Sequence, residues 1–191
     1  MKNFTKFCLL LLFTVSTGFA QFARVQVIHN SPDPAAANVD VYLNGILLLD
    51  NFAFRTATPF VNAPAGVPLK IDIAPANSTS VSGSIYNLTT TLTNGSTYIL
   101  VADGIVSQIG TTAPNFALSV FATGREMATD PMKTDVLVNH GSPDAPTVDV
   151  VETSVPAGTI VDNISFPNFA GYLELPTLDF TLDVRDATGA V

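Results

Sequence analysis

The sequence states one pattern twice. The segment His29-Asn30-Ser31-Pro32-Asp33, followed by Val39-Asp40-Val41, returns as His140-Gly141-Ser142-Pro143-Asp144, followed by Val148-Asp149-Val150. The two histidines are 111 residues apart. That interval is far longer than a solenoid repeat and matches the size of one compact domain. We therefore expect two copies of a single domain, over residues 21–122 and 135–191, joined by a linker at 123–134.

Residues 1–20 have the three parts of a secretory signal peptide. Lys2 and Lys6 supply the positive start, residues 7–15 form the apolar run, and Gly18-Phe19-Ala20 is a small-residue cleavage site before Gln21. The apolar run is shorter than the roughly 20 residues that a membrane-spanning helix needs. We expect an exported protein, in the periplasm, at the cell surface or outside the cell, with no transmembrane segment after cleavage.

Composition narrows the classes of function. The only cysteine, Cys8, lies in the expected signal peptide, so the mature chain has no thiol for catalysis or for binding zinc. Removing residues 1–20 takes away two lysines and no acid, which changes the net charge from −8 to −10. Such an acidic chain argues against a nucleic-acid partner.

The pattern of apolar residues predicts an all-β protein. Alternation and β-branched residues recur in short runs between turns, at 24–29, 39–43, 46–49, 69–73, 97–102 and 116–121, and again at 135–139, 147–151 and 179–184. Asn44-Gly45 is typical of a type I′ hairpin turn, and Asn94-Gly95 is interpreted as a second one. We expect an antiparallel β-sandwich of immunoglobulin-like or Greek-key type, with a closed barrel as the alternative.

The second copy is short. Its match to the first stops at Val191, so three or four strands of the first copy have no equivalent. An incomplete sandwich leaves a sheet edge unpaired. Truncation of the gene product is the favoured explanation. The alternatives are a missing C-terminal piece and docking of the half-module on the first domain or on another chain.

The repeated segment also resembles a known family. Residues 140–150, His-Gly-Ser-Pro-Asp-Ala-Pro-Thr-Val-Asp-Val, resemble the opening of DUF4397, a bacterial domain family of unknown function, and the first copy resembles it with Tyr42-Leu43-Asn44-Gly45 in the hairpin position. The first copy departs by two extra residues within 34–38, and the second by a longer loop at 152–158. The resemblance implies exported, often tandem, surface-associated proteins with no activity attached to the family.

The repeated histidines and aspartates are the candidate ligand or metal residues. An imidazole with carboxylates suits a divalent cation. The set is His29, Asp33, Asp40, His140, Asp144 and Asp149. The alternative, which we favour, is that each ring and carboxylate bonds the backbone of its own turn. The structural turn residues are Ser31, Pro32, Asn44, Gly45, Ser142 and Pro143. One histidine per copy cannot supply a closed zinc site. If the turn is structural, Asp33→Ala should lower the stability by about 1 kcal/mol, because one hydrogen bond of the turn is lost.

Motifs for catalysis are missing from the sequence. It contains no Gly-x-Ser-x-Gly and no Asp-x-Asp-x-Asp-Gly loop, and the remaining aspartates nominate no carboxylate pair. We therefore expect no enzyme and no cofactor, but an exported module for adhesion, scaffolding or ligand display, whose partner is a surface protein or a glycan. The alternative is a cation- or glycan-binding module that uses the repeated His/Asp turn, with Ca²⁺ as the cation.

Overall fold

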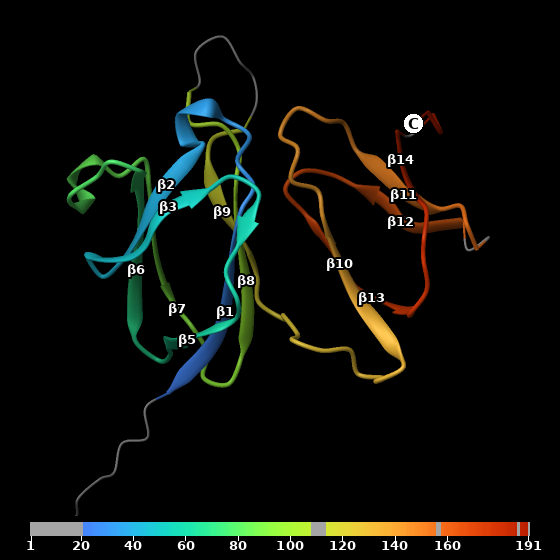
Figure 1. Ribbon diagram of the computed structural model, residues 1–191, viewed down its shortest axis with the longest axis horizontal. Helices are drawn as coiled ribbons and strands as arrows, with labels where there is room; N and C mark the ends of the chain where they lie inside the picture. Colours follow the sequence, from blue (N-terminus) through green and yellow to red (C-terminus); the bar gives the residue numbers. More distant parts are fainter. Residues whose placement is uncertain (1–20, 108–113, 156–157, 187, 191) are drawn as a thin grey trace, which may run out of the picture.

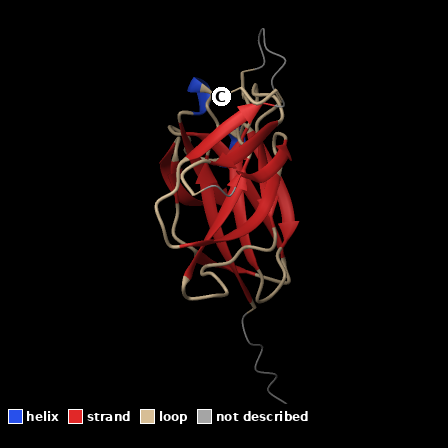
Figure 2. Cartoon of the chain, turned by 90° about the vertical axis from the view of Figure 1, so that its right-hand side faces the viewer, coloured by secondary structure: helices blue, strands red, loops and turns tan. Residues whose placement is uncertain are grey.

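The computed structural model describes residues 21–107, 114–155, 158–186 and 188–190, and in these ranges the chain is built almost entirely from β-strands. The helical elements of these ranges are two single 3-10 turns, η1 (Pro34–Ala36) and η2 (Val81–Gly83). The strands are β1 (Phe22–His29), β2 (Asn38–Leu43), β3 (Ile46–Ala53), β4 (Thr56–Ala57), β5 (Val61–Pro64), β6 (Pro68–Pro75), β7 (Tyr86–Thr91), β8 (Thr97–Asp103), β9 (Ala117–Phe121), β10 (Lys133–Asn139), β11 (Val148–Glu152), β12 (Gly158–Ile164), β13 (Phe169–Pro176) and β14 (Leu182–Asp186). The all-β class expected from the sequence is confirmed (Figure 2).

Two facing sheets form a sandwich in the first half of the chain. One sheet has the order β3-β2-β6-β7, and the other has the order β4-β1-β8-β9 with β5 also paired to β1 (Figure 1). Alternate side chains from both sheets meet in one core, whose buried members include Val25, Val39, Val41, Leu69, Ile73 and Leu100. This alternation is the period-2 pattern that predicts these strands in the sequence.

One pair of strands departs from the antiparallel expectation. β1 and β8 run parallel, in a register from Arg24 opposite Thr97 to His29 opposite Ala102. The other pairings between named strands of the described residues are antiparallel. This parallel pair joins β1 to a strand that lies more than 70 residues later in the sequence. A pairing over that distance cannot be predicted from a local sequence pattern.

The two Asn-Gly turns have different roles. Asn44 and Gly45 adopt φ of 52° and 80° between the paired strands β2 and β3, as a type I′ hairpin requires. Asn94-Gly95 lies between β7 and β8, which belong to opposite sheets. The prediction of a hairpin at Asn94-Gly95 is therefore wrong. The turn connects one sheet of the sandwich to the other, and each flanking strand pairs with other strands of its own sheet.

The strands of the second half have pairings similar to some of those in the first half. β10 pairs with β13, and β12-β11-β14 form a three-stranded sheet with the connections of β3-β2-β6. In both places an aspartate of the central strand accepts a hydrogen bond from the backbone of an asparagine with positive φ: Asp40 from Asn51 at 2.9 Å, and Asp149 from Asn163 at 2.7 Å. Within the described ranges, β7, β8 and β9 have no counterpart in this half. β10 begins at Lys133, within the expected linker.

The two halves are packed together. Figure 1 shows β10 and β13 on the side of the second half that faces β8 and β9. The ring of Phe121 on β9 lies 5.2 Å from that of Phe169 and 5.7 Å from that of Tyr172, measured between centroids. Arg125 lies over the Tyr172 ring at 4.4 Å and bonds Glu174 at 3.0 Å. These contacts pack the second half against β9 and the segment that follows it.

Candidate functional site

His29 ends β1 and is completely buried. Its Nε2 lies 2.7 Å from the carbonyl oxygen of Ala36, and its Nδ1 accepts a hydrogen bond from the backbone N–H of Ser31 at 3.4 Å. Both ring nitrogens are thus used within the turn, as a neutral imidazole with its proton on Nε2. Burial lowers the pKa of His29, and the hydrogen bond to Ala36 only partly opposes this. The ring therefore holds η1 against the end of β1.

Asp33 is the polar centre of the same turn, and its side chain is only 3% exposed. Oδ1 accepts from the backbone N–H of Ala35 at 2.9 Å, which caps η1. Oδ2 accepts from the backbone N–H groups of Val106 at 2.8 Å and Ser107 at 2.7 Å, and the Ser107 hydroxyl donates to both oxygens. Burial opposes the charge, but the hydrogen bonds from Ser107, Ala35 and Val106 outweigh it and lower the pKa of Asp33.

Ser31 completes this corner, and its hydroxyl donates to the carbonyl oxygen of Gly104 at 2.7 Å. Asp33 and Ser31 together tie the segment after β1 to the segment after β8. A buried polar group that is hydrogen-bonded in this way stabilises a fold, whereas an unbonded one destabilises it. Residues 30–33 form the irregular connection between β1 and η1.

Asp40 uses other partners on the opposite sheet. Besides the Asn51 backbone, it accepts from the Ser78 hydroxyl at 2.6 Å and from the Ser78 N–H at 3.2 Å. Burial opposes its charge, but these hydrogen bonds lower the pKa of Asp40. Asp40 shares neither Asn51 nor Ser78 with His29 or Asp33, so each of the three side chains has its own backbone contacts.

The second corner is more open than the first. His140 is also buried, and its Nε2 lies 2.9 Å from the carbonyl oxygen of Pro146, but its Nδ1 has no hydrogen-bond partner among the described residues. Asp144 is exposed, and its carboxylate accepts a hydrogen bond from the Ser142 hydroxyl at 3.1 Å. The counterparts of Val106 and Ser107, which hold Asp33, are missing because no strand equivalent to β8 is present among the described residues.

The two corners meet in space. The side-chain amide of Asn30 donates to the carbonyl oxygen of Gly141 at 3.3 Å, although 111 residues separate them. A Cβ at Gly141 would lie 2.1 Å from the Asn30 side chain, so the glycine makes this approach feasible. Across the described ranges, no three histidine, cysteine, aspartate or glutamate side chains are grouped closely enough to hold a metal ion.

Sequence reasoning missed the carboxylate with the most perturbed surroundings. Asp103 ends β8 and is 1% exposed. Its Oδ2 accepts from the Ser119 hydroxyl at 3.0 Å, and its Oδ1 has no partner among the described residues. Burial raises the pKa of Asp103 to about 6. Asp103 directly follows the continuous apolar run of residues 98–102, and its burial comes from a packed outer face of the sheet, which long-range packing decides.

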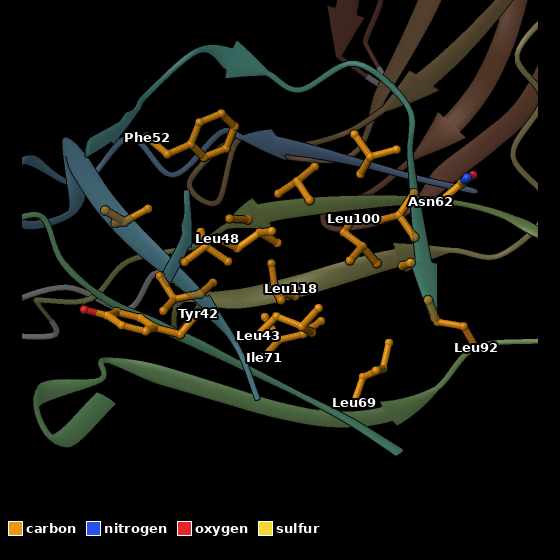
Figure 3. A pocket seen from close by; sticks show the side chains of 18 residues that line it. Tyr42, Leu43, Leu48, Phe52, Asn62, Leu69, Ile71, Leu92, Leu100 and Leu118 are labelled. Atoms are coloured by element: carbon orange, nitrogen blue, oxygen red, sulfur yellow. The ribbon is translucent and has the colours of Figure 1, made fainter. Parts of the chain in front are cut away.

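The cavity of the first half has no polar character. It has a volume of about 100 Å³, lies between the two sheets, and is lined almost wholly by aliphatic side chains, with the exposed Leu48 and Val61 among them (Figure 3). Aliphatic walls offer no ligand for a cation and no group for acid–base chemistry. The candidate residues of the sequence analysis do not line it.

The fold and the corner define a class: an all-β protein whose sandwich is fastened at one end by a buried His-x-Ser-Pro-Asp turn. The family model for a domain of unknown function, DUF4397, matches residues 23–150, and the chain belongs to this family. The expected resemblance is thereby confirmed for one copy. The matched stretch continues beyond residue 122 through β10 and into β11. Comparison with curated proteins finds no match.

Proposed function

We propose that the protein is a non-catalytic, exported β-sandwich module for adhesion, scaffolding or ligand display at the cell surface. The observation that carries the proposal is the use of the repeated polar residues. The side-chain nitrogens and oxygens of His29, Asp33 and Asp40 form hydrogen bonds with groups of the chain itself. Groups that are bonded in this way hold a scaffold and are not disposed toward a substrate.

We also infer that residues 135–191 are a second, incomplete copy of the same domain. Two observations support this. The central strands pair in the same register, since Val39 lies opposite Pro75 and Val148 opposite Asp186. The Asp–Asn and His–carbonyl bonds recur at equivalent positions, with Asp149 on Asn163 and His140 on Pro146. A tandem scaffold of this kind presents two related surfaces from one chain.

Export gives the first testable prediction. Among the residues that the structure describes, no helix has the length and apolar character needed to cross a bilayer. Expression of the full sequence in a bacterial host with its own export machinery should yield a product that begins at Gln21. Intact-mass analysis of the extracytoplasmic fraction and of the cytoplasm measures this. A soluble cytoplasmic product that keeps residues 1–20 would contradict export. Recovery of the mature protein in the cell-surface fraction of its own cells would support the proposed role.

The second candidate function is cation or glycan binding through the second corner. The observation that favours it is the open side of that corner, where His140 Nδ1 is unpartnered among the described residues and Asp144 is exposed. Under the scaffold proposal, addition of EDTA should leave the melting temperature of the mature chain unchanged. A sharp fall on chelation that Asp144→Ala abolishes, and that Asp179→Ala at another exposed position retains, would establish the cation-binding alternative.

A further inference from the structure

The cavity between the two sheets of the first half opens on one side of the sandwich. Most of its lining residues are buried, but solvent reaches Leu48 and Phe52 of β3 and Val61 of β5, which also line it (Figure 3). β3 is the end strand of one sheet, and β5 pairs only with β1 among the described strands of the other. The opening therefore lies between the edges of the two sheets. We call this feature the first-half cavity.

The two sides of the sandwich differ in how they are closed. On the side of β7 and β9, the rings of Tyr86 and Phe116 meet with 6.0 Å between their centroids. On the side of β3 and β5, both edges are irregular. The pairing of β3 with β2 shifts register at Leu48, which is the extra residue of a β-bulge. Residues 58–60 lie outside both β4 and β5, and Val27, which lines the cavity from β1, is only partly buried.

The interior of the first-half cavity offers no partner to a polar ligand. Apart from Phe52, Tyr42 and Asn62, its lining is aliphatic. The Tyr42 hydroxyl lies 2.9 Å from the Ser78 hydroxyl, and the Asn62 side-chain oxygen accepts a hydrogen bond from Arg24 at 3.0 Å. A polar group that moved from water into these surroundings would lose hydrogen bonds without replacement. The part of a ligand that lies inside must therefore be a hydrocarbon.

The size of the cavity limits how much of a ligand it can hold. Its volume is about 100 Å³, whereas a closed apolar cavity of about 150 Å³ binds one benzene molecule. Facing sheets pack about 10 Å apart, so the space between their side chains is narrow. Such a space suits the end of an unbranched chain better than a ring system. Outside the opening, Ile46 and Leu47 precede Leu48 on β3 and are 74% and 45% exposed, so the aliphatic surface continues there.

We propose that the first-half cavity binds the end of an unbranched aliphatic chain, which enters between β3 and β5. The terminal carbons contact the walls of the cavity, and the carbons nearer the polar head lie on the exposed aliphatic side chains of β3. The chemical class is that of acyl chains, carried either by a free fatty acid or by a lipid in a membrane. This inference goes beyond the proposed scaffold function and does not depend on it, because it rests on the cavity and not on the repeated corners.

A matched pair of small ligands tests the proposal on the full mature chain. Calorimetric titration with 1-octanol should show saturable binding at one site with a negative heat-capacity change. The melting temperature should rise with the concentration of octanol, because the ligand binds the folded state. The matched ligand is 1,8-octanediol, which has the same length and a hydroxyl at both ends. It should bind at least tenfold more weakly, because one hydroxyl would have to enter the apolar interior.

A cavity-filling variant locates the binding. Ala63 lines the cavity from β5 and is only partly buried, so Ala63→Leu adds carbon atoms to the cavity at a position near the sheet edge. Its affinity for octanol should fall at least tenfold. Ala57→Leu is the matched control, since Ala57 is exposed on β4 and does not line the cavity. It should bind octanol like the unsubstituted chain. Circular dichroism and the melting temperature verify that both variants are folded.

A second pair of variants tests the entrance without changing the core. Leu48→Glu places a charge at the opening, at a position that is already 53% exposed, and should weaken octanol binding at least threefold. Leu47→Glu is its control, because Leu47 is similarly exposed and does not line the cavity. Its affinity for octanol should be unchanged.

Two further probes identify the source of the chain. One is decanoate below its micellar concentration, and the other is vesicles of neutral phosphatidylcholine. Displacement of octanol by decanoate, without retention on vesicles, would assign free fatty acids. Retention on vesicles that Ala63→Leu abolishes would assign membrane lipids. Either result supports the aliphatic chain, and failure of both probes would overturn it.

Other outcomes would also overturn the proposal. They are absence of saturable octanol binding, equal affinity for octanol and octanediol, and unchanged octanol binding by a folded Ala63→Leu variant. A further one is a dimer in sedimentation velocity that excludes octanol and that Leu48→Glu dissociates, because a second copy of the chain would then cover the opening. Recovery of the protein in the cell-surface fraction is measured independently, so these results leave the test of the proposed function unaffected.

Discussion

Asp33→Ala is expected to lower the free energy of unfolding of the first half by about 3 to 5 kcal/mol. The substitution leaves the N–H groups of Ala35, Val106 and Ser107, whose bonds to Asp33 are partly buried, without their acceptor, and hydrogen bonds to a charged group contribute about 1.5 to 3 kcal/mol each. This is larger than the single turn bond inferred from the sequence. Urea unfolding monitored by tyrosine fluorescence and circular dichroism measures the change.

Asp144→Ala is the matched control because Asp144 occupies the same place in the second corner. Its carboxylate is exposed, so removing it should change stability by less than about 0.5 kcal/mol. Equal losses of stability for the two variants would contradict the conclusion that Asp33 stabilises the first half.

The lowered pKa values of Asp33 and Asp40 make the stability of the first half depend on pH. Their stabilisation is present above the unfolded-state pKa near 3.8 and is lost as the pH falls through their lower folded-state pKa values.

Asp103→Asn should stabilise the protein at pH 7 by up to about 3 kcal/mol. Burial raises the pKa of Asp103 from 3.8 to about 6, and one pKa unit corresponds to about 1.4 kcal/mol. The folded protein therefore binds this proton more tightly than the unfolded chain does. As the pH rises from 3.8 to 6, the charge is forced into a buried position and stability falls; above pH 6 the loss is complete. Neutral asparagine has the same shape without that charge.

The comparison of melting temperatures at pH 5 and pH 7.5 checks this sign. Asp103→Asn should gain more at pH 7.5 than at pH 5, because Asp103 is largely protonated at the lower pH. Asp179→Asn, at an exposed position, should show little gain at either pH. A destabilised Asp103→Asn at pH 7.5 would mean that the ionised carboxylate is held by favourable contacts and that its burial is not the dominant influence.

The elements that the sequence predicts correctly are those with local causes. Alternation of apolar residues places β2 and β6 to within a residue or two, and the positive φ of Asn44 and Gly45 makes the first hairpin recognisable. β4, β5 and β7 were not expected, since the first two are short and the third is a run of polar residues with few apolar alternations. The period of a strand is visible only where one face is consistently apolar.

The candidate site shows the same division. The His-x-Ser-Pro-Asp segment can be found in the sequence because it is repeated. The hydrogen-bond partners of Asp33 cannot be found in the same way, since Val106 is 73 residues away. The parallel pairing of β1 with β8 is equally non-local, and so is the burial of Asp103 on an outer face of the sheet. Long-range pairing decides these features, and a single sequence contains no marker of which strands become neighbours.

The parallel pairing of β1 and β8 also determines when the first half can close. β1 is the first strand to emerge from the ribosome, yet its parallel neighbour is complete only when Asp103 has been added. Until then, β1 has an open edge and the corner at Asp33 lacks the backbone groups of Val106 and Ser107 that hold it. Contacts so distant in sequence form slowly. The first half therefore cannot complete its fold, or fasten the corner at Asp33, until the chain has been made as far as Ser107.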